Sequence, residues 1–333
     1  MMRRIAINGF GRIGRTFLRI LLQRQEKEVE VVALNDLADP ESLAYSFKYD
    51  SVHGRWPAPF RVERNHFVTD GKKIAVLNEA DPSRLPWKEW EIDGVIECSG
   101  KFTNRAGALK HLQAGARKVL ISAPASDADL TVVMGVNEDQ YHPEQHQILS
   151  NASCTTNCLA PIAKILHETF TIEQGLMNTV HAYTASQSLL DRPMKKKRRG
   201  RAAALSLIPT TTGAAVAVGK VLPELAGKLD GLAVRAPVPD VSILDLVVQT
   251  REAVDVEKTL GAFRRAEQNP RLASILQVCE EELVSADYIG SSYSAVIDAP
   301  STMVMGEHLL RVLAWYDNEW GFTNRLVDVA RLI

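Results

Sequence analysis

Gly9-Phe10-Gly11-Arg12-Ile13-Gly14 is the stretch that sets the architecture of this chain. It follows an apolar run, Ile5 to Ile7, and opens a segment with helical spacing. In a GxGxxG turn the first glycine permits the tight bend, the second lets the backbone approach a pyrophosphate, and the third lets helix and strand pack closely. A bare GxGxxG could be an ordinary tight turn. Its position between strand and helix instead predicts a dinucleotide site, with the helix N-terminus facing the phosphates.

Asp36 bears on which dinucleotide binds. It stands just after the next apolar run, Val29 to Leu34, where a carboxylate accepts hydrogen bonds from a ribose hydroxyl. The same charge repels a 2′-phosphate, so the sequence favours NAD over NADP. The alternative is that Asp36 only caps the following turn.

Length and composition limit the classes of protein to consider. The chain has 333 residues, which favours two domains, and 46% hydrophobic with 24% charged residues is typical of globular proteins. A formal net charge of -1 creates no general attraction to nucleic acid or anionic membrane. There is no apolar run of transmembrane length and no secretory h-region, and the four cysteines form neither a disulfide framework nor a zinc pattern. These features predict a cytoplasmic protein without a metal site.

Apolar runs alternate with helical stretches in the first half, whereas the second half is richer in strands. The strands expected are Arg4 to Asn8, Val29 to Leu34, Gly94 to Cys98, Lys118 to Ser122, Leu232 to Val234 and Val241 to Thr250; the helices are Thr16 to Gln25, Ala160 to Phe170 and Gly321 to Ile333. We predict an α/β protein: a Rossmann-type doubly wound domain at residues 1–150 and an α+β catalytic domain with a mostly antiparallel sheet at 151–318. A C-terminal helix at 319–333 is expected to pack back on the first domain.

A second motif carries reactive groups. Ser150-Asn151-Ala152-Ser153-Cys154-Thr155-Thr156-Asn157-Cys158 places a thiol among small polar residues, before a helix expected to start near Leu159. At a helix N-terminus the dipole and free N–H groups lower the pKa of a thiol and can hold an oxyanion. Cys98 and Cys279 instead suit inert core positions.

This motif resembles the active-site signature of phosphorylating glyceraldehyde-3-phosphate dehydrogenases, and the resemblance extends from Ile5 to the C-terminus. The other matching stretches, in order, are His181-Ala182-Tyr183-Thr184, Arg199-Gly200-Arg201-Ala202-Ala203, Pro209-Thr210-Thr211-Thr212-Gly213-Ala214-Ala215 and Trp315-Tyr316-Asp317-Asn318-Glu319-Trp320-Gly321.

The resemblance implies a covalent mechanism. The Cys154 thiolate would attack the aldehyde to give a thiohemiacetal, hydride transfer to NAD would give a thioester, and inorganic phosphate would release an acyl phosphate. His181 matches the position of the base. Without the resemblance, His181 would be interpreted as a structural histidine.

The resemblance also assigns the binding residues. Those for the substrate anion are Thr184, Arg199 and Arg235, and those for inorganic phosphate are Ser153, Thr155, Thr212 and Gly213. Those for NAD are Gly9, Gly11, Arg12, Ile13, Asp36, Ser122 and Asn318, and Asn318 would hold the nicotinamide carboxamide. Ser99 and Gly100 follow a strand end near the expected cofactor path. A homotetramer is implied as well.

Some positions depart from the family pattern. Arg192 stands where NAD-using members usually carry an apolar or small residue, so some tolerance of NADP is a hypothesis. Phe322 replaces a frequent tyrosine and Val216 a frequent lysine. The basic run at 194–201 could indicate a nucleic-acid patch, but the family's interface loop explains it better.

Three alternatives stay open at this point. The first is an erythrose-4-phosphate dehydrogenase, which shares fold, cysteine and histidine but ends in hydrolysis. The second is a non-catalytic binding protein, although Cys154 and His181 are both retained. The third concerns Cys158, which could form a disulfide with Cys154 on oxidation but is better explained by packing.

Overall fold

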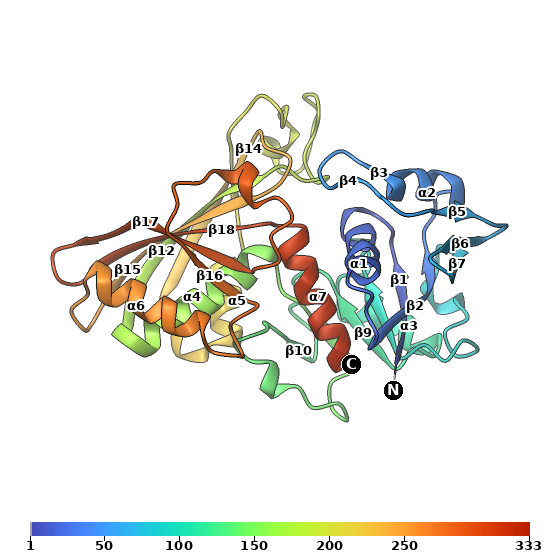
Figure 1. Ribbon diagram of the computed structural model, residues 1–333, viewed down its shortest axis with the longest axis horizontal. Coiled ribbons are helices and arrows are strands. Elements are labelled where there is room, and N and C mark those ends of the chain that lie inside the picture. The colour runs from blue at the N-terminus through green and yellow to red at the C-terminus, as the bar shows by residue number, and fades with distance from the viewer. Residues whose placement is uncertain (1) are drawn as a thin grey trace. The chain divides into compact units, whose positions relative to one another are not determined.

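The structure, a computed structural model, describes residues 2–333 and divides into two compact units, each with its own large sheet (Figure 1). The first unit comprises residues 2–132, 139–152 and 323–333, and the second comprises 133–138 and 153–322. The predicted fold class is confirmed by the strand order and pairing of these sheets. Across residues 2–333, none of the helices combines the length and apolar character required to cross a membrane.

The first unit is built on a nine-stranded sheet in the order β10-β11-β9-β8-β1-β2-β7-β6-β5. Its strands are β1 (Arg3–Asn8), β2 (Val29–Asn35), β5 (Arg61–Val62), β6 (His66–Thr69), β7 (Lys72–Leu77), β8 (Gly94–Glu97), β9 (Lys118–Ile121), β10 (Leu130–Thr131) and β11 (Ile148–Ser150). Pairing is parallel from β10 to β7, and only the β7–β6 and β6–β5 pairs are antiparallel. The chain order reverses at β1, which lies between β2 and β8. In a doubly wound sheet ligands bind outside the carboxyl ends of the strands at this switch point.

Four helices belong wholly or mostly to this unit. They are α1 (Arg12–Gln23), α2 (Pro40–Lys48), α3 (Arg105–Gln113) and α7 (Trp320–Leu332), and a small β3–β4 hairpin (Tyr49–Asp50 and Gly54–Arg55) follows α2. α1 begins directly after Gly11, earlier than the expected Thr16. Its first turn, residues 12–15, has a single apolar side chain, Ile13, so apolar spacing alone misses the start. Within the unit, the Arg331 carbonyl of α7 accepts a hydrogen bond from Arg3 Nε at 3.2 Å, which ties the end of this helix to β1.

The second unit contains a seven-stranded sheet in the order β13-β14-β12-β15-β18-β17-β16. Its strands are β12 (Ile172–Ala182), β13 (Ile208–Thr211), β14 (Leu229–Ala236), β15 (Ser242–Thr250), β16 (Leu276–Cys279), β17 (Ala295–Met305) and β18 (Leu309–Tyr316). Only the β12–β14 and β16–β17 pairs are parallel, so the sheet is mostly antiparallel as predicted. Its helices are α4 (Cys154–Phe170), α5 (Ala214–Val221) and α6 (Val256–Glu267), and short 3₁₀ turns lie at Lys197–Gly200, Pro223–Leu225 and Ser285–Tyr288. Two further 3₁₀ turns lie at Pro82–Arg84 in the first unit and at Glu138–Gln140, where the division between the units falls.

The start of α4 corrects a sequence prediction. The helix begins at Cys154 rather than near Leu159. Thr155, Thr156 and Asn157 are weak helix formers, so the apolar pattern underestimates the helix. The Ser153 side chain compensates by capping, because its Oγ accepts a hydrogen bond from the Thr156 N–H at 3.1 Å.

Candidate active site

Cys154 is the first residue of α4, at the end where backbone N–H groups have no partner within the helix. The preceding Ala152 has a φ of 55° and is fully buried, so the chain turns sharply before the helix. This turn presents the Cys154 side chain, which is partly exposed, at the positive end of the helix dipole. The position suits a thiol that meets an electrophile whose oxygen becomes negative.

His181 meets this thiol from the adjacent sheet. It lies near the end of β12, and its Nε2 is 3.4 Å from Cys154 Sγ. The imidazole is buried and packs edge-on against the Tyr316 ring, with 6.0 Å between centroids. A nucleophile and a base within hydrogen-bond reach, separated by 27 positions in the chain, are therefore brought together by α4 and β12.

Arg235, on the neighbouring strand β14, lies on the other side of the imidazole. Its Nη1 donates to the Ala182 carbonyl at 2.9 Å and lies 2.5 Å from His181 Nδ1. Burial and the Arg235 charge lower the pKa of His181 to about 3, so the imidazole is neutral at pH 7. Its Nδ1 lies 2.7 Å from the Ala182 carbonyl, and a proton donated to that carbonyl leaves Nε2 as the acceptor facing Cys154.

The thiol itself behaves differently from the sequence expectation. Burial raises the pKa of the Cys154 thiol, although the Arg235 charge and hydrogen bonds from Thr155 act in the opposite direction. The expected lowering is wrong for this structure because desolvation outweighs the helix terminus. Cys154 therefore needs a base, and the neutral His181 lies within reach of its proton.

The first unit contains a groove of about 310 Å³ at the carboxyl ends of its central strands. It is lined by Asn8, Gly9, Gly11, Asn35, Asp36, Leu37, Glu79, Ala80, Cys98, Ser99, Lys101 and Phe102. A Cβ on Gly14 would lie 2.2 Å from the Gly9 carbonyl oxygen, whereas a Cβ on Gly11 would meet nothing within 4 Å. The third glycine is thus required by packing, and the second leaves open space beside the groove. This shape fits a phosphate-bearing ligand at the glycine turn.

Asp36 lies in this groove with its carboxylate already engaged. It accepts hydrogen bonds from the Phe10 N–H at 2.7 Å and the Ala38 N–H at 3.1 Å. The carboxylate therefore braces the glycine turn and also caps the turn that follows. A carboxylate has further lone pairs, so these bonds are compatible with a ribose hydroxyl.

Comparison with known proteins assigns the family. The model of the glyceraldehyde 3-phosphate dehydrogenase NAD binding domain matches residues 3–105, and that of the C-terminal domain matches 153–318. The glyceraldehyde-3-phosphate dehydrogenase of Geobacillus stearothermophilus is 54% identical over 333 residues, covering 100% of this chain and 98% of the relative. Glyceraldehyde-3-phosphate dehydrogenase 1 of Bacillus cereus is 53% identical, covering 99% and 98%, and glyceraldehyde-3-phosphate dehydrogenase 2 of Trichormus variabilis is 50% identical, covering 100% and 98%. This chain belongs to the glyceraldehyde-3-phosphate dehydrogenase family.

The residues expected to bind anions in this family do not all contact one another. Arg235 lies beside His181, whereas Arg199 Nε donates to Thr210 Oγ1 at 3.0 Å. The Thr184 hydroxyl is 2.9 Å from Ser186 Oγ. Thr212 Oγ1 accepts from the Ala214 N–H at 3.2 Å, and Gly213 caps α5, which packs beside α4. Hydroxyls and N–H groups thus gather at two helix N-termini.

Other expected positions have clear structural places. Arg12 and Ile13 open α1, and Arg12 pairs with Asp50 at 2.5 Å. Ser122 follows β9 and donates from Oγ to the Glu97 carbonyl at 2.9 Å. In the second unit, Asn318 Oδ1 accepts from Ser242 Oγ at 2.7 Å.

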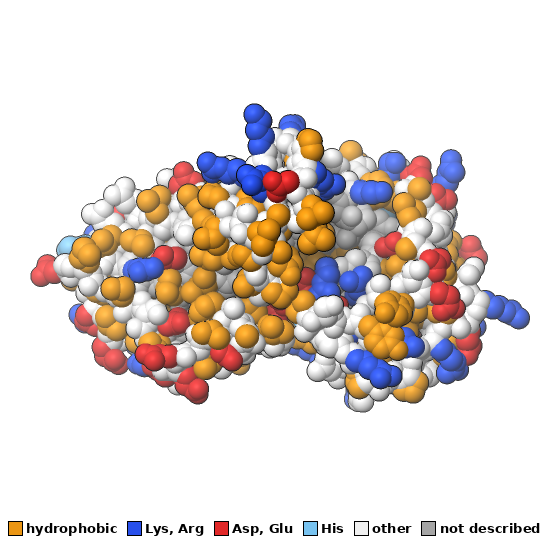
Figure 2. All heavy atoms as spheres, turned by 90° about the horizontal axis from the view of Figure 1, so that it is seen from above, with side chains coloured by type: hydrophobic (Ala, Val, Ile, Leu, Met, Phe, Trp, Pro, Cys, Tyr) orange, Lys and Arg blue, Asp and Glu red, His pale blue; other side chains and the backbone are white. Residues whose placement is uncertain are grey.

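Two of the three departures from the family pattern, Arg192 and Val216, are exposed. Arg192 is exposed on the basic loop, and its N–H donates to the Gly200 carbonyl at 2.8 Å. Val216 is exposed on α5, and Phe322 is buried. Figure 2 shows Lys and Arg side chains along one edge of the molecular face that it presents. The loop charges are partly engaged, since Lys196 Nζ donates to Thr211 Oγ1 at 3.1 Å and Arg201 pairs with Asp191 at 2.8 Å.

The structure adds a residue whose role the sequence misses. Tyr316 looks like core packing in the aromatic C-terminal motif, but its hydroxyl lies 2.9 Å from Thr155 Oγ1 and 2.7 Å from Thr179 Oγ1. A buried tyrosine hydroxyl needs a partner, which is the signal that could have indicated this. Cys158 is a free, fully buried thiol on α4, in line with a packing role, and burial raises its pKa well above the usual value.

Proposed function

We propose that this chain catalyses the NAD-dependent, phosphorylating oxidation of D-glyceraldehyde 3-phosphate to 1,3-bisphosphoglycerate. The observation that carries the proposal is the 3.4 Å approach of His181 Nε2 to Cys154 Sγ at the N-terminus of α4. Membership of the glyceraldehyde-3-phosphate dehydrogenase family supports the substrate and the cofactor.

In the proposed mechanism Cys154 is the nucleophile and His181 the base. His181 takes the thiol proton as sulfur attacks the aldehyde carbon, and the developing oxygen charge is stabilised by the α4 N-terminus. NAD, when bound, would accept the hydride that leaves this carbon, and the carbon–oxygen double bond would re-form to give a thioester on Cys154. Phosphate oxygen then attacks the thioester carbon, the carbon–sulfur bond breaks, and Cys154 is released together with the acyl phosphate.

The residues proposed for NAD are Gly9, Gly11, Arg12, Ile13, Asp36, Ser122 and Asn318. The fit is supported by the groove beside Gly9 and Gly11 and by the Asp36 carboxylate on its wall. Asn318 has its Oδ1 occupied by Ser242, which leaves its Nδ2 to donate to a carboxamide oxygen. Arg192 keeps NADP tolerance as a secondary proposal. Measuring kcat/KM with both cofactors tests it, and an NADP preference would overturn the assignment of NAD.

Two anions need to be held, one on the substrate and one as the attacking group. We assign Thr184, Arg199 and Arg235 to the substrate phosphate, and Ser153, Thr155, Thr212 and Gly213 to inorganic phosphate. The hydroxyls and N–H groups at the starts of α4 and α5 support the second assignment, because helix N-termini favour anions.

The experiment that tests the function is a substrate and phosphate matrix. Glyceraldehyde 3-phosphate and erythrose 4-phosphate are each assayed with NAD, with and without inorganic phosphate. The proposal predicts that sustained turnover requires phosphate and prefers the three-carbon sugar. Phosphate-independent turnover with a preference for erythrose 4-phosphate would overturn it.

We further propose a cytoplasmic homotetramer in which residues 1–150 with the helix at 319–333 bind NAD and 151–318 carry catalysis. The two compact units and the ranges matched by the family models support this division. The strand register supports assembly, because exposed apolar side chains share one face of the second unit's sheet: Leu176, Val180, Leu232, Met303, Met305 and Leu309. Figure 2 shows such side chains open to solvent on one side of the molecule.

Light scattering tests the assembly. The protein should elute with four times the 36.8 kDa chain mass, and Leu176→Asp with Met305→Asp should lower that mass. A monomeric wild-type protein at micromolar concentration would contradict the tetramer.

A further inference from the structure

Glu97 is a buried carboxylate that the proposed mechanism does not use. It ends β8, is 1% exposed, and lies where the parallel strands reach the cofactor groove. A buried acidic side chain is costly unless several donors satisfy it. Glu97 is surrounded by such donors, and their hydrogen bonds offset the cost of burying its side chain.

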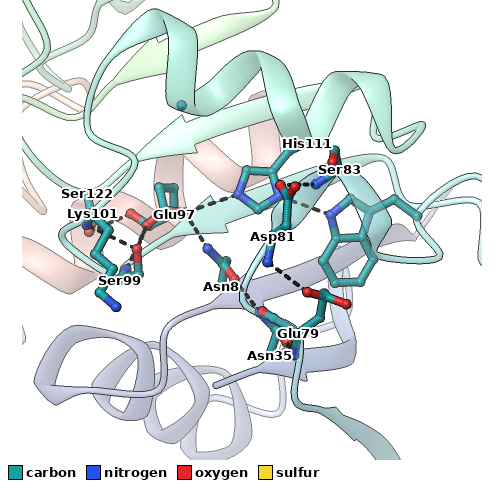
Figure 3. A network of polar contacts seen from close by, with 12 residues as sticks. Asn8, Asn35, Glu79, Asp81, Ser83, Glu97, Ser99, Lys101, His111 and Ser122 are labelled. Atoms are coloured by element: carbon teal, nitrogen blue, oxygen red, sulfur yellow. Dashed lines mark hydrogen bonds and ion pairs between the residues drawn. The ribbon is translucent and has the colours of Figure 1, made fainter. Parts of the chain in front are cut away.

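Four donors converge on this carboxylate (Figure 3). Oε1 accepts from the Ser99 N–H at 2.7 Å and from Ser99 Oγ at 2.5 Å. Oε2 accepts from Asn8 Nδ2 at 2.6 Å and contacts His111 Nε2 at 3.1 Å. Charge-assisted bonds of this kind are stronger than neutral ones, so the carboxylate fixes its neighbours firmly.

The directions of these bonds are forced by groups that can only donate. Trp87 Nε1 donates to His111 Nδ1 at 3.1 Å, so the ring proton lies on Nε2 and points to Glu97. Asn8 must turn its Nδ2 to the carboxylate and its Oδ1 away. Asn35 Nδ2 then donates to that Oδ1 at 2.8 Å.

The hydrogen bonds between Asn35 and Glu79 agree with these amide orientations. Asn35 Oδ1 accepts from the Glu79 backbone N–H at 2.9 Å, and Asn35 Nδ2 also reaches the Glu79 carbonyl at 2.9 Å. A flipped amide at either asparagine would bring two donors together. Glu97 therefore sets the orientation of the side chains that end β1 and β2, Asn8 and Asn35. Both line the groove, as do Glu79 and Ser99.

The same carboxylate holds the turn that supports the glycine loop. A Cβ on Gly9 would lie 2.5 Å from Ser99 N and Cα, so the Ser99 turn packs directly on the first glycine. Gly9 has a φ of 93°, a conformation that glycine adopts readily. Movement of the Ser99 turn would displace the loop that approaches the pyrophosphate.

We propose that Glu97 is a positioning residue for NAD: its buried carboxylate holds the Ser99 turn against Gly9 and orients Asn8 and Asn35, so that the groove is formed before the cofactor arrives. This inference rests on the proposed NAD-dependent function. A preformed site avoids the cost of ordering groups on binding, which raises affinity without new contacts.

The test compares Glu97→Gln with Glu89→Gln, which removes one charge from an exposed position of the same unit. The Glu97→Gln side chain keeps the shape of the carboxylate but turns an NH₂ toward either the Ser99 N–H or Asn8 Nδ2, both of which can only donate. Titration calorimetry with NAD and with ADP-ribose should show a Kd about tenfold higher for Glu97→Gln, and a wild-type Kd for Glu89→Gln. In steady-state assays KM for NAD should rise, while KM for the aldehyde and kcat at saturating NAD stay within about twofold.

A purely structural role gives a different result. Loss of folded protein lowers the active fraction and kcat but leaves the Kd for ADP-ribose unchanged, and that outcome overturns the inference. If Glu97→Gln does not fold, Ser99→Ala decides, because it keeps the other donors and should raise the Kd about threefold. An unchanged Kd in Ser99→Ala would then count against the inference. Failure of the wild-type protein to bind NAD would instead refute the proposed cofactor.

Discussion

Arg235 and His181 form a contact on the side of the imidazole away from Cys154. Arg235 Nη1 lies 2.5 Å from His181 Nδ1, while His181 Nε2 lies 3.4 Å from Cys154 Sγ. The guanidinium cannot lose its proton near neutral pH, so it disfavours a second positive charge on the ring. The imidazole is thereby kept neutral, and the Ala182 carbonyl 2.7 Å from Nδ1 takes the ring proton on that side, which leaves Nε2 facing the thiol without a proton.

This contact predicts a pH dependence of stability. The pKa of His181 is lowered to about 3 in the folded chain, against about 6.5 when unfolded. Between these values the unfolded state binds the extra proton, so stability is present above pH 6.5 and is lost as pH falls. At pH 5 the loss is about 2 kcal/mol from this group alone.

Urea unfolding of His181→Asn at pH 7.5 and pH 5 checks this prediction. The variant should lose about 2 kcal/mol less than the wild-type protein between the two pH values. Exposed His308→Asn is the control and should keep the wild-type difference. If His181→Asn also keeps it, the histidine is not held neutral by its surroundings.

The kinetic role of His181 is tested by His181→Gln. Since the pKa of the Cys154 thiol is raised by burial, loss of the base leaves few thiolates, and acylation should slow by about 10²–10⁴-fold. The burst of NADH formation after rapid mixing measures this step. NAD affinity should stay at the wild-type value, and a burst of normal rate would remove His181 from the mechanism.

Tyr316→Phe is predicted to destabilise the second unit. It removes the hydroxyl that joins Thr155 and Thr179 and leaves both buried threonine hydroxyls without this partner. An unsatisfied buried hydroxyl costs about 1–3 kcal/mol. Chemical unfolding should show a loss in this range, and Tyr45→Phe, at a side chain 66% exposed, should show almost none. KM for phosphate should also rise, because Thr155 is no longer held.

Local patterns predicted much of the fold because they depend on neighbours in the chain. The strand before Gly9 and the helix after Gly11 follow from apolar spacing and glycine geometry. The start of α4 could not be predicted this way, since Ser153 capping replaces apolar spacing over its first turn. Element boundaries fail where a side chain, rather than periodicity, determines the end.

Local sequence patterns could not predict which residues far apart in the chain come into contact. Cys154 and His181 were paired through family resemblance, because nothing in their spacing indicates contact. Glu97 and His111 lie within one βα unit, yet only the fold shows that Trp87 sets the ring proton between them. Direction in a hydrogen-bond network is a property of the assembled site.

The glycine turn offers a matched pair of substitutions that separates folding from binding. A Cβ on Gly14 would lie 2.2 Å from the Gly9 carbonyl oxygen, so Gly14→Ala forces helix and strand apart. Overpacking of this kind costs about 1–3 kcal/mol. Gly11 has a φ of −73° and open space at its Cβ, so Gly11→Ala should change stability by less than about 0.5 kcal/mol.

NAD binding should be weakened by Gly11→Ala even though this variant keeps its stability. The open space beside Gly11 is where a pyrophosphate would approach the backbone, so Gly11→Ala should weaken NAD by about tenfold or more in a fully folded protein. Calorimetric titration on both variants, with unfolding curves under the same conditions, makes the comparison. A methyl group on residue 11 would block a pyrophosphate that approaches the backbone there. Wild-type affinity in Gly11→Ala would therefore mean that the cofactor phosphates lie elsewhere.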